Sequence, residues 1–251
     1  MKIIRSATVA VAAGVLLLAG CTPAKKNRAH AAPSASVSAA PIGNGIPALT
    51  AAEILNRAST QIKAAKTYHV SGNMTSDGFT MEFDLKVAGK DKSGVITGSN
   101  GKMEMLAVGG TQYGRMDKKF WTAVLGAELG KKMVAQLKGR WIKAPKGKES
   151  ASIAQWFDVV DIDKMLDEAA GSTSLSKGAL TEFNGTPVII LTDEDSGTSL
   201  YVATTGQPYL LKIGDIGGSR MVFSDFDKEF PEIKAPAPSD VMEAPAAKKK
   251  A

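Results

Sequence analysis

The sequence predicts an α+β domain in which one curved antiparallel β-sheet is covered by helices on one side. Three observations predict it. A capped helical pattern opens the region, runs with a two-residue hydrophobic period follow it, and a helical stretch separates them from a second series of strand-like runs. No internal repeat is present, so we expect a single folded domain over residues 48–234.

Residues 1–20 have the pattern of a secretory signal peptide. Lys2 and Arg5 precede an apolar stretch from Ala7 to Leu18, and the small pair Ala19-Gly20 follows. The apolar stretch is shorter than the about 20 residues that a membrane-spanning helix needs. We therefore expect this segment to be removed rather than to remain as an anchor.

Cys21 is the sole cysteine of the chain and follows the signal-like segment directly. The run Leu18-Ala19-Gly20-Cys21 resembles a bacterial lipobox, in which the thiol receives a diacylglycerol and becomes the acylated first residue. Two or more acyl chains hold a protein stably on a bilayer, whereas one does not. We expect Cys21 to be a lipid anchor at the extracytoplasmic face of the cell membrane, with a chance cysteine behind an ordinary signal peptide as the alternative.

Two segments without a periodic apolar face flank the predicted domain. Residues 21–47 and 235–251 are rich in Ala, Ser and Pro, which indicates a lipidated flexible tether and a flexible tail. The tether should span roughly 30 Å. Its residues Lys25, Lys26 and Arg28, in a chain of net charge +6, favour a membrane surface, although a solvated basic linker explains them equally well. No interleaving of basic and aromatic residues points to a nucleic-acid partner.

The folded part opens with a helix that has a clear start signal. Thr50 and Glu53 have the spacing of a capping box, and Leu49 can pack on Ile54 across the first turn. Apolar residues then recur at helical spacing at Ile54, Leu55, Ala58, Ile62 and Ala65. One face of this helix must therefore be covered by the sheet.

Strand-like runs with one buried and one solvent-exposed face follow the helix. In "FTMEFDLKV", the odd positions from Phe79 to Val87 are apolar and the even positions are polar. Neighbouring runs predict an antiparallel meander: "YHVSGNMT", "SGVITGS", "KMEMLAV", "TQYGRMD" and "FWTAV". A helical stretch is expected between residues 124 and 170, interrupted by extended "RWIKAP". Five more strand-like runs then close the domain: "LTEFNG", "PVIILTD", "SLYVAT", "PYLLKIGD" and "RMVFSDF".

The residues that would carry catalysis or metal binding are sparse. The two histidines are His30 in the tether and His69 in the first strand, and no nucleophile motif lies near His69. Three aspartates at 158, 161 and 163 lack the alternating spacing of a calcium loop. Glycine-rich stretches at 108–114 and 214–219 match no phosphate-binding pattern. We therefore expect a protein that is not an enzyme and that holds no metal or cofactor.

The order of these segments resembles the LolA-like lipoproteins of actinobacteria, of the LppX_LprAFG type. The likeness rests on the lipobox, the tether, "ALTAAEILNRASTQIKAAKTYHVSGNM", "KGRWIKAP" and the closing "SLYVATTGQPYLLKIGD" and "MVFSDFDKEFPEIKAPAPSDV", over about residues 49–241. It implies a half-open β-barrel with helices over its concave side and an apolar cavity for acyl chains. It also implies carriage of a lipid or lipoglycan within the cell envelope, and it supplies no catalytic residues.

Such a cavity would be lined by apolar side chains of the predicted strands. The candidates are Phe79, Met81, Phe83, Leu85, Met103, Met105, Ile189, Leu191, Leu200 and Val202. Because methionine is unbranched and adaptable, it suits a cavity for varied acyl chains. A solid core would contain the same residues, so the sequence leaves cavity and core open.

Two functions remain from this reading. The first is an acyl-chain carrier held to the membrane through the diacylglycerol on Cys21, with a membrane transporter or another envelope protein as a possible partner. The second is a sensor or adaptor lipoprotein of the envelope, not an enzyme, whose sheet is solidly packed and whose surface binds a protein.

Overall fold

A computed structural model describes residues 43–76, 79–145, 167, 174–216 and 218–243. All of these residues belong to one compact unit. The predicted signal segment, Cys21 and the predicted helix around residues 153–160 lie outside the described residues. In the part of the chain that the structure describes, no helix is long and apolar enough to cross a bilayer.

The first helix, α1 (Ala51–Ala64), begins where the capping box predicts. The backbone N–H of Glu53 donates to Thr50 Oγ1 at 3.3 Å, and the Thr50 N–H donates to Glu53 Oε2 at 2.9 Å. These bonds satisfy donors that the first turn leaves without intrahelical acceptors. A 3₁₀ turn, η1 (Ile46–Ala48), precedes α1 and inserts the fully buried Ile46 into the core.

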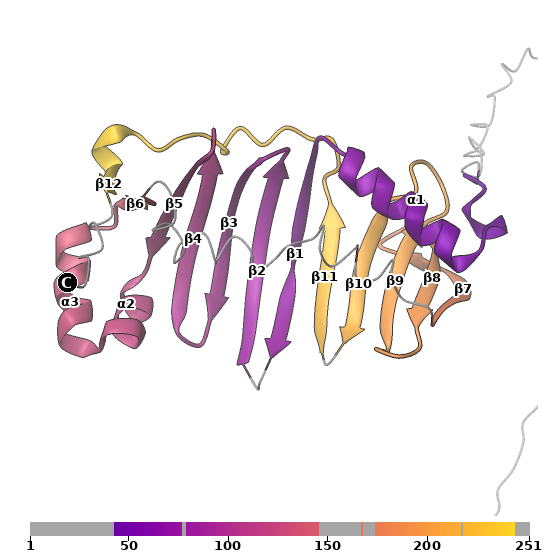
Figure 1. Cartoon of the computed structure of the whole chain (residues 1–251), viewed down its shortest axis with the longest axis horizontal. Coiled ribbons are helices and arrows are strands. Elements are labelled where there is room, and N and C mark those ends of the chain that lie inside the picture. Colours follow the sequence, from indigo (N-terminus) through magenta and orange to yellow (C-terminus); the bar gives the residue numbers. More distant parts are fainter. Residues whose placement is uncertain (1–42, 77–78, 146–166, 168–173, 217, 244–251) are drawn as a thin grey trace, which may run out of the picture. The chain divides into compact units, whose positions relative to one another are not determined.

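The described strands form one curved sheet that does not close on itself (Figure 1). The N-terminal series is β1 (Thr67–Ser76), β2 (Phe79–Ala88), β3 (Asp91–Gly98), β4 (Gly101–Val108), β5 (Thr111–Met116) and β6 (Trp141–Lys143). The C-terminal series is β7 (Leu175–Phe183), β8 (Thr186–Asp193), β9 (Thr198–Ala203), β10 (Leu210–Ile216), β11 (Ser219–Ser224) and β12 (Val241–Glu243). Their order is β12-β6-β5-β4-β3-β2-β1-β11-β10-β9-β8-β7, so the expected α+β class with a curved sheet is confirmed.

The sheet is mixed rather than wholly antiparallel, because β12 pairs in parallel with β6. All other pairings are antiparallel. After β11 the chain runs along the ends of the N-terminal strands to reach β6 (Figure 1), through the 3₁₀ turn η3 (Pro238–Asp240). Residues 238–243 therefore have regular structure inside the segment that its Pro and Ala content predicts to be a flexible tail.

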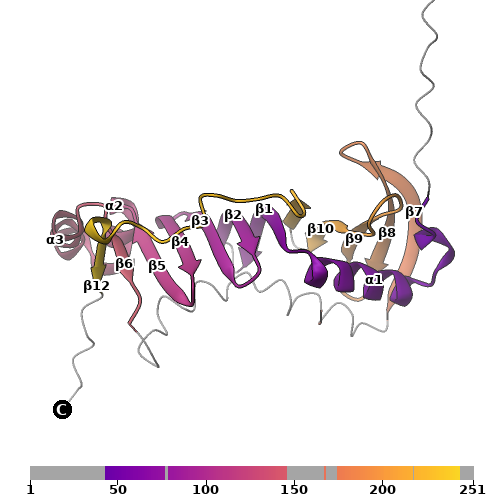
Figure 2. The ribbon, with the colours of Figure 1, turned by 90° about the horizontal axis from the view of Figure 1, so that it is seen from above.

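Helix α1 covers one end of the apolar face of the sheet. It contacts β7, β9 and β10, and Figure 2 shows it running across this end of the sheet. Its side chains Ile54, Leu55, Ala58 and Ile62 are all at most 2% exposed. Four of the five residues in the predicted stripe are thus buried, whereas Ala65 is the half-buried C-cap residue of α1.

Two further helices, α2 (Lys118–Leu125) and α3 (Ala127–Leu137), form a hairpin between β5 and β6. The prediction that "FWTAV" is a strand is wrong, because these residues lie in α2. The Asp117 side chain caps α2 by accepting from the Phe120 N–H at 2.7 Å, which favours helix over an extended chain. Gly130 then lets α3 approach the α2 backbone, since a Cβ there would lie 2.7 Å from Thr122 Cα.

Candidate functional site

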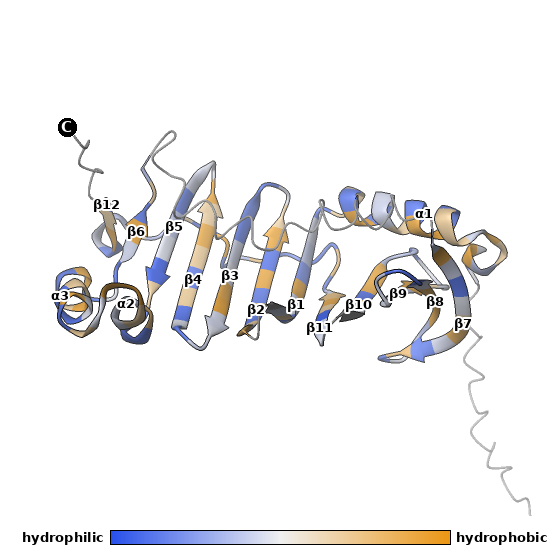
Figure 3. Cartoon of the chain, turned by 60° about the horizontal axis from the view of Figure 1, so that its bottom comes forward, coloured by the Kyte–Doolittle hydropathy of each residue, from blue (hydrophilic) through white to orange (hydrophobic). Residues whose placement is uncertain are grey.

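The register of β2, β3 and β4 places a set of apolar side chains on one face. Phe83 lies opposite Ile96, and Ile96 lies opposite Met103, so these three share that face. Figure 3 shows the alternation of hydrophobic and hydrophilic residues along these strands. Near the start of β2 the facing positions are glycines. Met81 lies opposite Gly98, and Gly98 lies opposite Gly101.

This glycine pair removes side-chain volume at the ends of β3 and β4 and leaves room for a pocket. Helix α2 packs beside this glycine pair. Gly101 has a φ of 116°, and a Cβ at this position would lie only 2.4 Å from the Phe120 nitrogen. Gly101 therefore permits both the backbone conformation and the close approach of the helix.

The resulting pocket has a volume of about 220 Å³. Its lining comes from β2, β3, β4, the turn between β3 and β4, and α2: Phe79, Thr80, Met81, Ile96, Gly98, Ser99, Asn100, Gly101, Met103, Phe120 and Val124. None of these residues is charged, and the polar ones, apart from Thr80, belong to the turn. The pocket is thus an apolar hollow with a polar rim, which suits an uncharged hydrocarbon group and disfavours a charged one.

The structure distributes the ten predicted lining residues over three environments. Phe79, Met81 and Met103 line the pocket, and Phe79 is 63% exposed at its mouth. Phe83, Leu85 and Met105 are buried further along the same face.

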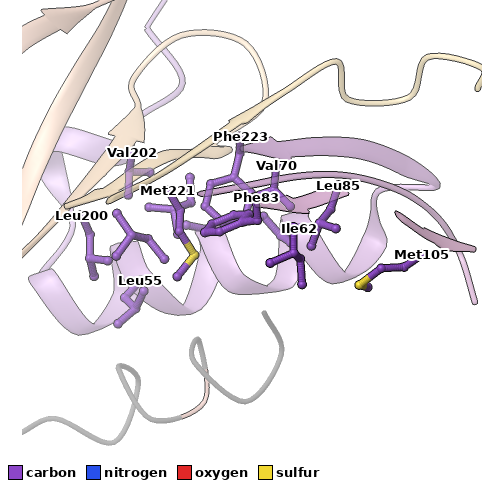
Figure 4. Packing of buried hydrophobic residues seen from close by; sticks show 14 of the residues in the cluster. Leu55, Ile62, Val70, Phe83, Leu85, Met105, Leu200, Val202, Met221 and Phe223 are labelled. Atoms are coloured by element: carbon purple, nitrogen blue, oxygen red, sulfur yellow. The ribbon is translucent and has the colours of Figure 1, made fainter. Parts of the chain in front are cut away.

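Ile189, Leu191, Leu200 and Val202 are at most 2% exposed and belong to the same buried cluster as the α1 residues Leu55 and Ile62. Figure 4 shows Leu200 and Val202 on the strands that α1 crosses. Cys21 lies outside the described residues.

Eight lining residues are not among the predicted ones, and the large apolar side chains of this group are Ile96, Phe120 and Val124. Ile96 shares its face of β3 with Gly94 and Gly98, two residues to either side, and this glycine spacing is a signal for open space beside it. The sequence predicts a strand for Phe120 and Val124, whereas the structure places both on α2 in the wall of the pocket. The signal for a helix was Asp117, a good N-cap residue three positions before Phe120.

A larger hollow of about 370 Å³ lies on the opposite, polar face of the sheet. It is lined by Ser71, Gly72, Asn73, Glu82, Phe83, Asp84, Val95, Thr97, Arg220 and Val222. Beside it, His69 Nε2 lies 3.0 Å from Asp84 Oδ1, and His69 Nδ1 lies 3.2 Å from Ser224 Oγ.

The Ser224 hydroxyl is also placed to donate to Asp225 Oδ2 at 3.3 Å, and the imidazole tautomer decides whether His69 or Ser224 donates in the contact between them. The arrangement links β2, β1 and β11 across the polar face.

Ion pairs stabilise the rest of the polar face. Burial alone would raise the pKa of Glu104, but hydrogen bonds from Lys102 and Arg115 outweigh it, so this pKa lies below its ordinary value. Among the described residues, no group of His, Cys, Asp and Glu side chains is placed to hold a metal ion.

Comparison with known proteins gives matches in structure only. No protein-family profile and no curated protein matches the sequence. The chain is similar to LprF of Mycobacterium bovis. The TM-score is 0.47 at 13% identity, over 74% of this chain and 97% of LprF.

Two further matches are more distant. An uncharacterized conserved protein from Thermus thermophilus gives a TM-score of 0.36 at 10% identity, over 76% of this chain and 98% of the other. MucB, solved in complex with the periplasmic part of MucA, gives 0.34 at 15% identity, over 74% of this chain and 60% of MucB.

Proposed function

We propose that the chain is a membrane-anchored extracytoplasmic lipoprotein that binds acyl chains of a lipid or lipoglycan and carries them within the cell envelope. The observation that supports this most is the uncharged lining of the pocket between the β2–β4 ends and α2. A hydrocarbon chain gains free energy by leaving water for such a surface, at about 25 cal/mol per Å².

The size of the pocket limits what it holds. Ligand pockets usually measure about 300 to 1,000 Å³, and this one measures about 220 Å³. We therefore propose that it takes the terminal part of one acyl chain. Met81 and Met103 contribute flexible thioether side chains to its wall, which allows the wall to adapt to chains of different shape.

The test compares two tryptophan substitutions in fatty-acid uptake. Met81→Trp fills the pocket at a half-buried position and should abolish uptake of a fluorescent fatty acid while the fold persists. Leu191→Trp overpacks a fully buried position beneath α1 and should cost about 1 to 3 kcal/mol of stability while uptake persists. Native mass spectrometry of the unchanged protein should find a co-purified lipid.

The adaptor function makes the opposite prediction. If the unchanged protein carries no lipid and takes up no fatty acid, and crosslinking captures a protein partner, the carrier proposal is wrong. Equal uptake by Met81→Trp and the unchanged protein would remove this pocket as the binding site.

A further inference from the structure

Three of the four large apolar side chains that are exposed in the described residues lie on or beside the α2–α3 hairpin, and the fourth, Leu180, lies on β7 at the opposite edge of the sheet. The four are Phe79, Val124, Leu129 and Leu180, with exposed fractions of 63%, 58%, 59% and 63%. Phe79 and Val124 line the same pocket, and Leu129 lies on α3 just beyond Gly126, the residue between the two helices. Single exposed apolar residues are common, but a group of three beside a pocket indicates an interaction surface.

The helical hairpin holds these side chains outward. At its base, the cap at Asp117 and the close approach of Gly101 fix α2 against β4. The contact of Gly130 with Thr122 fixes α3 against α2. Val124 and Leu129 lie on either side of the connection, at the end of α2 and the start of α3.

The same hairpin carries a strong positive charge. Residues 117–140 contain six Lys or Arg residues and two acidic residues, a net charge of +4. The lysines at 118, 119, 131, 132 and 138 are all exposed. At the other end of the sheet, residues 175–203 of β7, β8 and β9 contain one lysine and four acidic residues, a net charge of −3. A negatively charged surface therefore attracts the hairpin end and repels the opposite end.

The predicted lipid anchor permits this orientation. The described chain begins next to β9, where the Asn44 N–H donates to the Thr204 carbonyl at 2.9 Å. From β9 to β4 there are six strand spacings, about 29 Å at 4.8 Å each. The tether from Cys21, with its expected span of roughly 30 Å, is long enough to cover this distance. The anchor and the hairpin can thus lie on one membrane surface together.

We propose that the α2–α3 hairpin, with Phe79 beside it, is a docking surface for an anionic bilayer. Its exposed apolar side chains enter the interface, its lysines pair with the lipid head groups, and the mouth of the pocket faces the lipid. That the pocket receives an acyl chain there rests on the proposed function, whereas the docking itself does not.

The experiment places an environment-sensitive fluorophore on the hairpin of the full chain. Val124→Cys is labelled with a nitrobenzoxadiazole dye, and the protein is reconstituted into vesicles of phosphatidylcholine with or without phosphatidylglycerol. Thr181→Cys on the exposed β7 edge is the matched label position, and the unchanged chain treated with the same dye reports any label on Cys21. A blue shift for the Val124 label that requires phosphatidylglycerol and is weakened by salt supports docking.

Charge replacements test the lysines. Lys119→Gln with Lys132→Gln removes two charges, each worth about fivefold near an anionic surface, so the ratio of docked to undocked domain should fall about 25-fold. Lys90→Gln with Lys234→Gln makes the same change in net charge at exposed sites elsewhere and should have little effect.

Three results would overturn the proposal: no shift for the Val124 label, an equal shift for the Thr181 label, or equal effects of the two charge pairs. A shift that appears equally on phosphatidylcholine and grows with the surface density of protein would instead assign the hairpin to contact between copies of the chain. Because no step measures acyl uptake, failure here is distinct from failure of the carrier function.

Discussion

Gly72 lies in β1 where β11 passes closest, and we expect Gly72→Ala to destabilise the fold strongly. A Cβ at this position would lie 2.0 Å from the Arg220 carbonyl oxygen, about 1.4 Å short of the 3.4 Å at which ordinary contact begins. The obstructing atom belongs to backbone, so the two strands must separate. Overpacking costs about 1 to 3 kcal/mol or more. Alanine gives the unfolded chain less conformational entropy than glycine does, and this effect offsets only about 0.4 to 1 kcal/mol of the cost.

We therefore expect a loss of about 2 to 3 kcal/mol, which lowers Tm by about 5 to 10 °C in a domain of this size. Circular dichroism during thermal and urea unfolding measures it. Gly98→Ala is the matched control, because its Cβ would meet nothing closer than Met81 Cγ at 3.6 Å. A Gly72→Ala protein within about 0.5 kcal/mol of the unchanged one, or a control that is destabilised as much, would refute this reasoning.

Three further changes test the helix cap, the core and the ion pairs. Thr50→Ala removes the α1 cap and should cost about 1 kcal/mol in urea unfolding, whereas Thr50→Ser should restore most of it. Leu200→Ala, at a position 1% exposed, should cost about 2 to 5 kcal/mol, and a loss under 1 kcal/mol would mean that the site is not packed. The hydrogen bond from Lys86 lowers the pKa of Glu232, so this contact stabilises the fold above the ordinary glutamate pKa and is lost as pH falls through the lowered value. The protection of the amides of residues 229–234 against hydrogen exchange should fall as the pH is lowered through the depressed pKa of Glu232; Lys86→Gln should remove that dependence, and an unchanged acid response in that variant would contradict the assignment.

Local sequence signals predicted most of the fold. The Thr50–Glu53 spacing located the start of α1, and the alternation from Phe79 to Val87 identified the buried face of β2. The errors lie where distant residues decide the structure. Phe120 to Val124 is a short run of aromatic and β-branched residues that suits a strand, and its helical form depends on the Asp117 cap and on packing with α3. Strand β12 follows a Pro-rich segment, and it forms because β6, about 100 residues earlier, offers an edge.

The candidate site was harder to predict than the fold. The periodicity of β2 and β4 selected Met81 and Met103, but the same pattern selected Leu191 and Leu200, which α1 covers. Periodicity reports which face a side chain occupies and carries no information on what lies over it. The pocket exists because Gly98 and Gly101 face each other across β3 and β4 and because α2 packs beside them. Both features depend on residues that come together only in the folded chain.

The pairing of β1 with β11 has a consequence for biogenesis. Together with the short parallel pairing of β12 with β6, it joins the N-terminal and C-terminal series in the described sheet, and it brings His69 beside Ser224, residues 155 positions apart. Each series can assemble early from hairpins between neighbours, which is fast, but β1 keeps an open edge until synthesis has passed residue 224. If the chain is exported from its N-terminus, β1 crosses the membrane with the backbone N–H and C=O groups of this edge unpaired. An unpaired edge of this kind promotes association with other chains, so we expect chaperone binding during export to be concentrated there.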